Sequence, residues 1–214
     1  MRVNKTGLYI VIEGQDGTGK TTQLNLLADY FEKQGRNVLI LNEGARQDSG
    51  LPATDRIGAT VKTRTFDLDP LTNVLLFTAQ RSELWRKLAE PMLEQGGVVI
   101  SSRNWWSTLA YQHYGQGVDK QLINEITAKF MPARYVKPDY GVILTLDDIE
   151  RAKRTTGRDD SHKNDTFESQ KIDFQKKVNR GYLEIAREFQ IPIIDASDTV
   201  EKIHQEIKRC LRSN

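Results

Sequence analysis

Residues 14–21 read Gly14-Gln15-Asp16-Gly17-Thr18-Gly19-Lys20-Thr21, and this stretch fits the phosphate-binding pattern G-x-x-x-x-G-K-[ST]. The apolar run 8–12 precedes it and predicts a buried strand. Residues 22–34 follow it, with apolar side chains at helical spacing. Strand, glycine loop and helix in this order are the context that the motif requires, so we expect a phosphate-binding P-loop here.

The chemistry of such a loop comes from its backbone and from two side chains. Glycines let backbone N–H groups approach phosphate oxygens, and the helix N-terminus adds positive potential. We expect Lys20 to reach the β- and γ-phosphates and the Thr21 hydroxyl to bind Mg²⁺. The candidate nucleotide-binding residues are Gly14, Gln15, Asp16, Gly17, Thr18, Gly19, Lys20, Thr21 and Thr22.

Composition limits the class of protein. The chain of 214 residues suits one domain with a substantial core. Its 31 basic and 29 acidic residues give a net charge of +2, which argues against a nucleic-acid partner. The single cysteine, Cys210, has no partner for an internal disulfide and fits the reducing cytoplasm. No apolar stretch approaches 18 residues and the first residues lack a signal-peptide pattern, so we expect no membrane association.

Apolar runs alternate with helical patterns along the chain. Further strands are predicted at 37–41, 98–100, 142–146 and 191–194, and helices at 70–89, 174–189 and 200–211. Pro91 is expected to break or kink the helix that starts at Pro70. Strands alternating with helices indicate an α/β fold with a doubly wound parallel sheet. The polar segment 155–165 reads as a mobile loop or lid.

Several motifs together resemble the thymidylate kinase family of nucleoside monophosphate kinases. The P-loop with its flanks (12–22) is close to the first motif of that family, and 75–81 resembles its substrate-binding helix. Ser102-Arg103 with 107–112 resembles its D-R-(Y/H)-x-x-S-T-x-A-Y-Q segment. Residues 165–168 resemble the region after its lid. The resemblance covers most of the chain and rests on the order and spacing of these motifs.

The resemblance implies a fold and an activity. The fold would be a three-layer P-loop NTPase domain spanning 1–214, with a five-stranded parallel sheet flanked by helices and a lid at about 155–166. The activity would be phosphorylation of dTMP to dTDP with ATP and Mg²⁺, a step of dTTP biosynthesis. It also implies a cytoplasmic homodimer that acts on a small nucleotide.

Three positions suggest how an acceptor would be held. Arg103 follows a strand at the carboxyl edge of the sheet, where open α/β folds bind ligands, and the matching family arginine holds the acceptor phosphate. Phe77 and Arg81 share one helix face, so an aromatic ring and a guanidinium can stack on a base and donate to its carbonyl. In the family they contact thymine. Core packing of Phe77 and a solvated Arg81 remain the plain alternatives.

The resemblance implies further substrate contacts. Tyr111 matches the tyrosine that favours deoxyribose, and Asp16 matches the carboxylate for the acceptor's 3′-hydroxyl and is a second candidate Mg²⁺ ligand. Ser107, Thr108 and Gln112 lie in the same motif, the last two within reach of the base edge, and Glu43 is retained from a motif after the second strand. A merely packed helix remains the alternative for Thr108, Tyr111 and Gln112.

A catalytic arginine is expected in the lid. Some family members carry an arginine inside the P-loop, but this chain has Gly17 there. Arg154 or Arg158 can therefore close over the donor phosphates like an arginine finger. Together with Lys20 and Arg103 they form the predicted catalytic set, and a solvated basic lid is the alternative.

Three departures from the family pattern leave other functions open. Ser102 replaces an aspartate, Asn42-Glu43-Gly44-Ala45 replaces R-E-P-G, and Asp165-Thr166-Phe167-Glu168 lacks an arginine. Asp16 or Glu13 can take over the role of the lost aspartate. The alternatives are a deoxynucleoside monophosphate kinase with another or broader acceptor, and a catalytically weakened nucleotide-binding or sensor protein.

Overall fold

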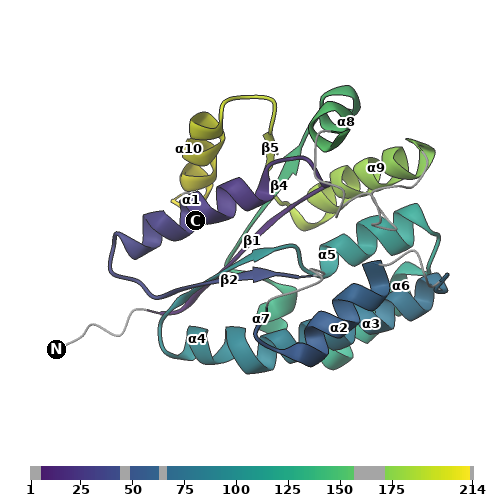
Figure 1. Cartoon of the computed structure of the whole chain (residues 1–214), viewed down its shortest axis with the longest axis horizontal. Coiled ribbons are helices and arrows are strands. Elements are labelled where there is room, and N and C mark those ends of the chain that lie inside the picture. Colours follow the sequence, from purple (N-terminus) through teal and green to yellow (C-terminus); the bar gives the residue numbers. More distant parts are fainter. Residues whose placement is uncertain (1–5, 44–48, 63–66, 157–171, 213–214) are drawn as a thin grey trace.

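A five-stranded parallel sheet forms the centre of the computed structural model, which describes residues 6–43, 49–62, 67–156 and 172–212 (Figure 1). The strands lie in the order β2-β3-β1-β4-β5, and every neighbouring pair is parallel. They are β1 (Leu8–Gly14), β2 (Val38–Asn42), β3 (Val98–Ser102), β4 (Tyr140–Thr145) and β5 (Ile193–Asp195). The predicted fold class is confirmed, with strand ends shifted by a few residues.

Side chains of β1 alternate between two hydrophobic cores. Tyr9 and Val11 belong to one core, whereas Ile10 and Ile12 belong to the other. All four are buried, because helices cover both faces of the sheet. The face of Ile10 is covered by α1 (Lys20–Glu32) and α10 (Val200–Cys210), which pack against each other.

The face of Tyr9 carries most of the remaining helices (Figure 1). The long α9 (Ile172–Phe189) packs along a π-helical segment, η2 (Leu109–Gly115), which continues α5 (Trp105–Thr108). On the same face, α3 (Pro70–Leu84) packs against α2 (Pro52–Lys62) and α6 (Lys120–Phe130). The short helix α7 (Ala133–Val136) precedes β4. No element was predicted at 52–62 or 120–136.

Pro91 does not break the helix that begins at Pro70. The helical course continues through a π-helical segment, η1 (Trp85–Ala89), into α4 (Glu90–Glu94), which contains Pro91. The N–H of Glu90 bonds to the carbonyl of Trp85, so the helix is widened just before the proline. The wider turn accommodates a ring and a missing donor that a regular α-helix does not tolerate.

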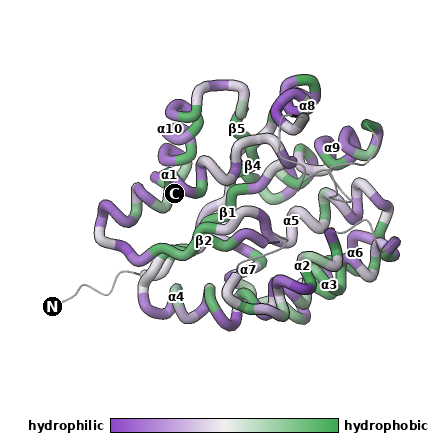
Figure 2. The backbone as a smooth tube through the Cα atoms, viewed as in Figure 1, coloured by the Kyte–Doolittle hydropathy of each residue, from purple (hydrophilic) through white to green (hydrophobic). Residues whose placement is uncertain are grey.

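The predicted lid is described only at its start. The helix α8 (Asp148–Thr156) follows β4, and the expected lid residues from 157 to 166 lie outside the described residues. Figure 2 shows that α8 is largely hydrophilic, whereas the strands of the sheet carry mostly hydrophobic residues. Within the described ranges, no helix is long and apolar enough to span a membrane.

Candidate active site

The loop between β1 and α1 presents backbone N–H groups at the carboxyl edge of the sheet. Gly19 is the N-cap of α1 and no side chain caps the helix, so a bound anion can take that position. Gly17 has φ +94°, a left-handed conformation in which a side chain would be strained. At Gly14 a Cβ would also lie 2.3 Å from the carbonyl oxygen of Leu144, so the loop requires glycine there.

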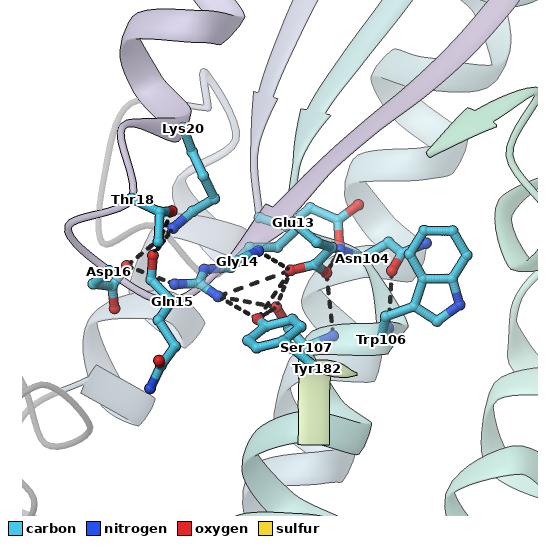
Figure 3. Close-up of polar contacts among 12 residues, drawn as sticks. Glu13, Gly14, Gln15, Asp16, Thr18, Lys20, Asn104, Trp106, Ser107 and Tyr182 are labelled. Atoms are coloured by element: carbon cyan, nitrogen blue, oxygen red, sulfur yellow. Dashed lines mark hydrogen bonds and ion pairs between the residues drawn. The ribbon is translucent and has the colours of Figure 1, made fainter. Parts of the chain in front are cut away.

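Lys20 turns back over this loop. Its Nζ donates to the carbonyl oxygen of Gln15 at 2.8 Å and lies 3.5 Å from Asp16 Oδ1 (Figure 3). Burial and the nearby Arg103 lower the pKa of Lys20 to about 7, although Asp16 and Glu13 act in the opposite direction. A phosphate group arriving at this position would therefore meet a cationic donor whose charge the phosphate itself stabilises.

Glu13, at the end of β1, is fully buried and holds the segment that follows β3. Its Oε1 accepts from the backbone N–H groups of Asn104 (2.7 Å) and Ser107 (3.1 Å). Its Oε2 accepts from the hydroxyls of Ser107 (2.8 Å) and Tyr182 (3.0 Å) (Figure 3). Because both oxygens are used for this purpose, we assign Glu13 to the architecture of the site and not to Mg²⁺.

Arg103 is held in an unusual backbone conformation above Glu13. Its φ is +91°, which is rare for a residue with a side chain and is typical of functional sites. One guanidinium nitrogen donates to Ser107 Oγ and to the Tyr182 hydroxyl, both at 3.0 Å. The other contacts Asp16 Oδ1 at 2.5 Å. The predicted phosphate-binding arginine thus lies beside the P-loop.

Asp16 faces two cations. Burial alone would raise the pKa of Asp16, but Arg103 and Lys20 outweigh this effect and hold the pKa well below its ordinary value. The carboxylate therefore stays charged and joins the P-loop to Arg103. Its position between two cations does not favour a divalent metal ion at the same oxygen.

Arg81 and Glu43 form a second buried pair. Arg81 Nε donates to Glu43 Oε2 at 2.9 Å, and Arg81 Nη1 donates to Thr108 Oγ1 at 2.5 Å. The guanidinium carbon lies 5.3 Å from the centre of the Phe77 ring. Phe77 and Arg81 therefore do share one helix face, and Arg81 is buried at 4% exposure instead of solvated.

The other predicted acceptor residues divide into two groups. Tyr111 lies under Arg103, with the guanidinium carbon 5.3 Å from its ring centre, and Ser107 and Thr108 bond to Arg103 and Arg81 as described. Gln112 is buried but donates to Gln116 at 3.3 Å on its own helix. The structure thus brings Ser107, Thr108 and Tyr111 to the two arginines, and it shows no contact of Gln112 with either in the described residues.

The predicted lid arginines take different positions. Arg154 contacts Glu150 at 3.3 Å and the carbonyl of Ala196 at 3.1 Å, beyond β5, and Arg158 lies outside the described residues. Two residues of α8 approach the P-loop: Thr155 Cγ2 lies 3.0 Å and Arg151 Cγ lies 3.2 Å from where a Cβ on Gly17 would be. Closure of Arg154 or Arg158 over a nucleotide stays a prediction.

A metal ion would have few protein ligands here. In the described part of the chain no three His, Cys, Asp or Glu side chains form a metal-binding group. Thr21 lies exposed in the first turn of α1, next to the anion-binding N-terminus. This arrangement fits Mg²⁺, which keeps several waters and binds mainly through nucleotide phosphates.

Sequence reasoning missed several residues of the site. Tyr182 falls within the helix predicted at 174–189 without a role in the site, and no role was predicted for Asn104 or Tyr135. Glu13 was considered only as a substitute for the lost aspartate, which would organise Mg²⁺ or the acceptor phosphate. An acidic residue that directly follows a buried apolar strand is itself a signal of a paired interior carboxylate.

Comparisons with known proteins point in one direction. The family described as thymidylate kinase matches residues 12–207. A probable thymidylate kinase of Thermococcus gammatolerans is 36% identical over 205 residues, which cover 94% of each chain. A thymidylate kinase of Wolbachia pipientis is 39% identical over 84% of this chain and 81% of its own. The crystal structure of thymidylate kinase from Ehrlichia chaffeensis superposes with a TM-score of 0.71 and 28% identity, over 96% of this chain and 99% of that chain.

Replacement of Glu13 tests its structural role. Glu13→Gln places an amide NH₂ group against backbone and hydroxyl donors, so we expect the free energy of unfolding to fall by about 2–4 kcal/mol. Urea unfolding measures the change. The control Glu150→Gln, at an exposed position of α8, should change stability by less than about 0.5 kcal/mol. Equal effects of the two variants would contradict the role of Glu13.

Proposed function

The chain belongs to the thymidylate kinase family and is an enzyme that phosphorylates dTMP to dTDP; we propose that ATP with Mg²⁺ is its phosphoryl donor. The observation that supports this proposal most is the position of Arg103. It lies beside the P-loop and pairs with Asp16 of that loop at 2.5 Å. An acceptor phosphate bound to Arg103 would therefore lie next to a donor phosphate bound to Lys20.

The donor would occupy the P-loop and the start of α1. Backbone N–H groups of the loop and Lys20 would hold its β- and γ-phosphates. We assign Mg²⁺ to the Thr21 hydroxyl and the donor phosphates, and no longer to Asp16, because Asp16 faces two cations. When bound, the ion supplies charge neutralisation to the phosphates.

The acceptor would lie between Arg103 and Arg81. Arg103 would hold the phosphate of dTMP, while Phe77 would stack on thymine and Arg81 would donate to its carbonyl. Asp16 would accept from the 3′-hydroxyl, and Tyr111 would limit the space at the 2′ position. A ligand that lacks either the phosphate or the base would lose one of these two anchors.

Transfer then needs positioning more than covalent chemistry by the protein. A phosphate oxygen of dTMP attacks the γ-phosphorus, the bond to the bridging oxygen breaks, and ADP leaves with that oxygen. Lys20 and Arg103 stabilise the negative charge on the donor and acceptor phosphates in the transition state. Both cations are already fixed by hydrogen bonds in the structure, so little reorganisation precedes the reaction.

We infer that two copies of the chain pack through α3 and α6. Leu75 and Phe130 are exposed at 49% and 48%, and Leu122 is exposed at 36%. Leu75 and Phe130 line a shallow groove of about 270 Å³ between α3 and α6. A second copy would cover this apolar face, and α3 also carries Phe77 and Arg81, so the contact would support the acceptor site.

The acceptor range tests the proposed activity directly. Coupled ADP release with ATP and Mg²⁺ should be strong with dTMP and weak with dUMP, dCMP, dGMP, dAMP and UMP. Lys20→Ala should lower kcat about a hundredfold or more while unfolding remains cooperative. A preference for another nucleotide would contradict the acceptor assignment, and full activity of Lys20→Ala would contradict the role of the P-loop.

Phe77 should act on the acceptor and not on the donor. Phe77→Ala removes a stacking surface, so we expect the KM for dTMP to rise about tenfold and the KM for ATP to stay within twofold. Phe31→Ala is a matched control, because Phe31 is equally buried but belongs to the opposite core. Equal rises of both KM values in Phe77→Ala would place Phe77 in the core only.

The oligomeric state can be measured by light scattering. We expect a mass of twice the 24.5 kDa chain. Phe130→Asp should give the monomer, whereas Ile149→Asp, at an exposed position of α8, should leave the dimer intact. A monomeric wild-type chain would exclude this interface.

A further inference from the structure

Tyr135, on α7, donates a hydrogen bond to the carboxylate that holds Arg81. Its hydroxyl lies 2.7 Å from Glu43 Oε2, the same oxygen that accepts from Arg81 Nε. Tyr135 is fully buried, and burial together with Glu43 raises the pKa of its hydroxyl well above the ordinary value. The hydroxyl therefore stays protonated and acts as the donor. No role was predicted for this residue.

Packing fixes the ring of Tyr135. It stacks on Tyr9 of β1, with ring centres 6.0 Å apart and an interplanar angle of 22°. The edge of Trp85 in η1 meets it at 5.4 Å and 85°. Tyr9 and Trp85 also contact each other, so three aromatic rings from three elements hold the hydroxyl in place.

Glu43 itself lies outside regular structure. It follows the last residue of β2, and its side chain is buried at 4% exposure. Among the described residues, Arg81 and Tyr135 donate hydrogen bonds to its carboxylate. Arg81 reaches Glu43 through a long side chain with several rotatable bonds. Of the two partners of the carboxylate, Tyr135 is therefore the one whose position is fixed by packing in the core.

We propose that Tyr135 is a positioning residue for the acceptor: through Glu43 it orients the guanidinium of Arg81 towards the base. This inference rests on the proposed function, in which Arg81 contacts thymine. Nη1 of Arg81 is held by Thr108, and Nε is held by Glu43, so the plane of the guanidinium is defined by two anchors. Loss of the Tyr135 hydroxyl releases the Glu43 anchor, and Arg81 can then rotate away from the base.

The charges around Glu43 support the inference. Burial raises the pKa of Glu43 to about 7, the nearby Glu13 acts in the same direction, and Arg81 and Tyr135 oppose it. The hydroxyl of the buried Tyr9 lies near the same carboxylate, and burial together with Glu43 keeps its pKa well above the ordinary value, so Tyr9 stays neutral. Below about pH 7 Glu43 becomes neutral and holds Arg81 less firmly, so dTMP should bind more weakly as the pH falls. Without the Tyr135 hydrogen bond the pKa of Glu43 rises further, and this weakening should begin at a higher pH.

The test compares Tyr135→Phe with Tyr9→Phe. Tyr135→Phe keeps the ring but removes the donor, so we expect the KM and Kd for dTMP to rise about tenfold, with the KM for ATP within twofold of wild type. Tyr9→Phe removes another buried hydroxyl from the same aromatic cluster, one that does not bond to Glu43, and should leave dTMP binding within twofold. An unchanged Kd for dTMP in Tyr135→Phe, or equal changes for dTMP and ATP, would overturn the proposal.

A double-mutant cycle shows whether Tyr135 acts through Glu43. In a Glu43→Gln background, Tyr135→Phe should raise the Kd for dTMP by less than a further twofold, because the carboxylate through which Tyr135 orients Arg81 is already absent. A full additional effect would overturn the proposal. The pH at which dTMP binding weakens should also shift upward in Tyr135→Phe but not in Tyr9→Phe.

Arg81→Ala separates this inference from the proposed function. If Arg81→Ala leaves the KM for dTMP unchanged, the acceptor role of Arg81 is wrong and the inference falls with it. If Arg81→Ala raises that KM and Tyr135→Phe does not, only the positioning role of Tyr135 is wrong.

Discussion

The carboxylate of Glu13 connects the parts of the protein that meet at the active site. It belongs to β1, yet it accepts hydrogen bonds from the backbone after β3, from Ser107 and from Tyr182 of α9. A buried carboxylate destabilises the fold unless hydrogen-bond donors surround it. Moving these groups apart would therefore expose Glu13 to solvent or leave it buried without donors. Arg103 depends on the same network, because its guanidinium bonds to Ser107 and Tyr182 and its backbone takes a left-handed φ.

Arg103 and Arg81 each form an ion pair with a different carboxylate. Asp16 and the Glu13 network hold Arg103, which would bind the phosphate in the proposed acceptor site, and Glu43 holds Arg81, which would bind the base there. Fixed guanidinium groups lose little side-chain entropy when a ligand binds, which favours both affinity and correct orientation. If these roles hold, affinity for the phosphate and selectivity for the base would depend on different carboxylates.

Features that depend on residues close together in the sequence could be predicted, whereas contacts between residues far apart in the sequence could not. The P-loop was predictable because its glycines, lysine and flanking elements are contiguous, and Phe77 and Arg81 were paired by helical spacing. The Glu13 network was not, because Tyr182 lies 169 residues away and has the pattern of a core residue. The helix α2 contains Gly58 and β-branched residues, which disfavour a helix. Packing against α3 and a hydrogen bond from Gln80 to Thr54 hold it in place.

Binding of dTMP compared with thymidine tests the central claim most directly. If Glu13 acts by holding Arg103 against the acceptor phosphate, Glu13→Gln should weaken calorimetric binding of dTMP about tenfold or more. Its affinity for thymidine, which lacks the phosphate, should stay within twofold of wild type. Equal losses for the two ligands, or no loss for dTMP, would contradict the account.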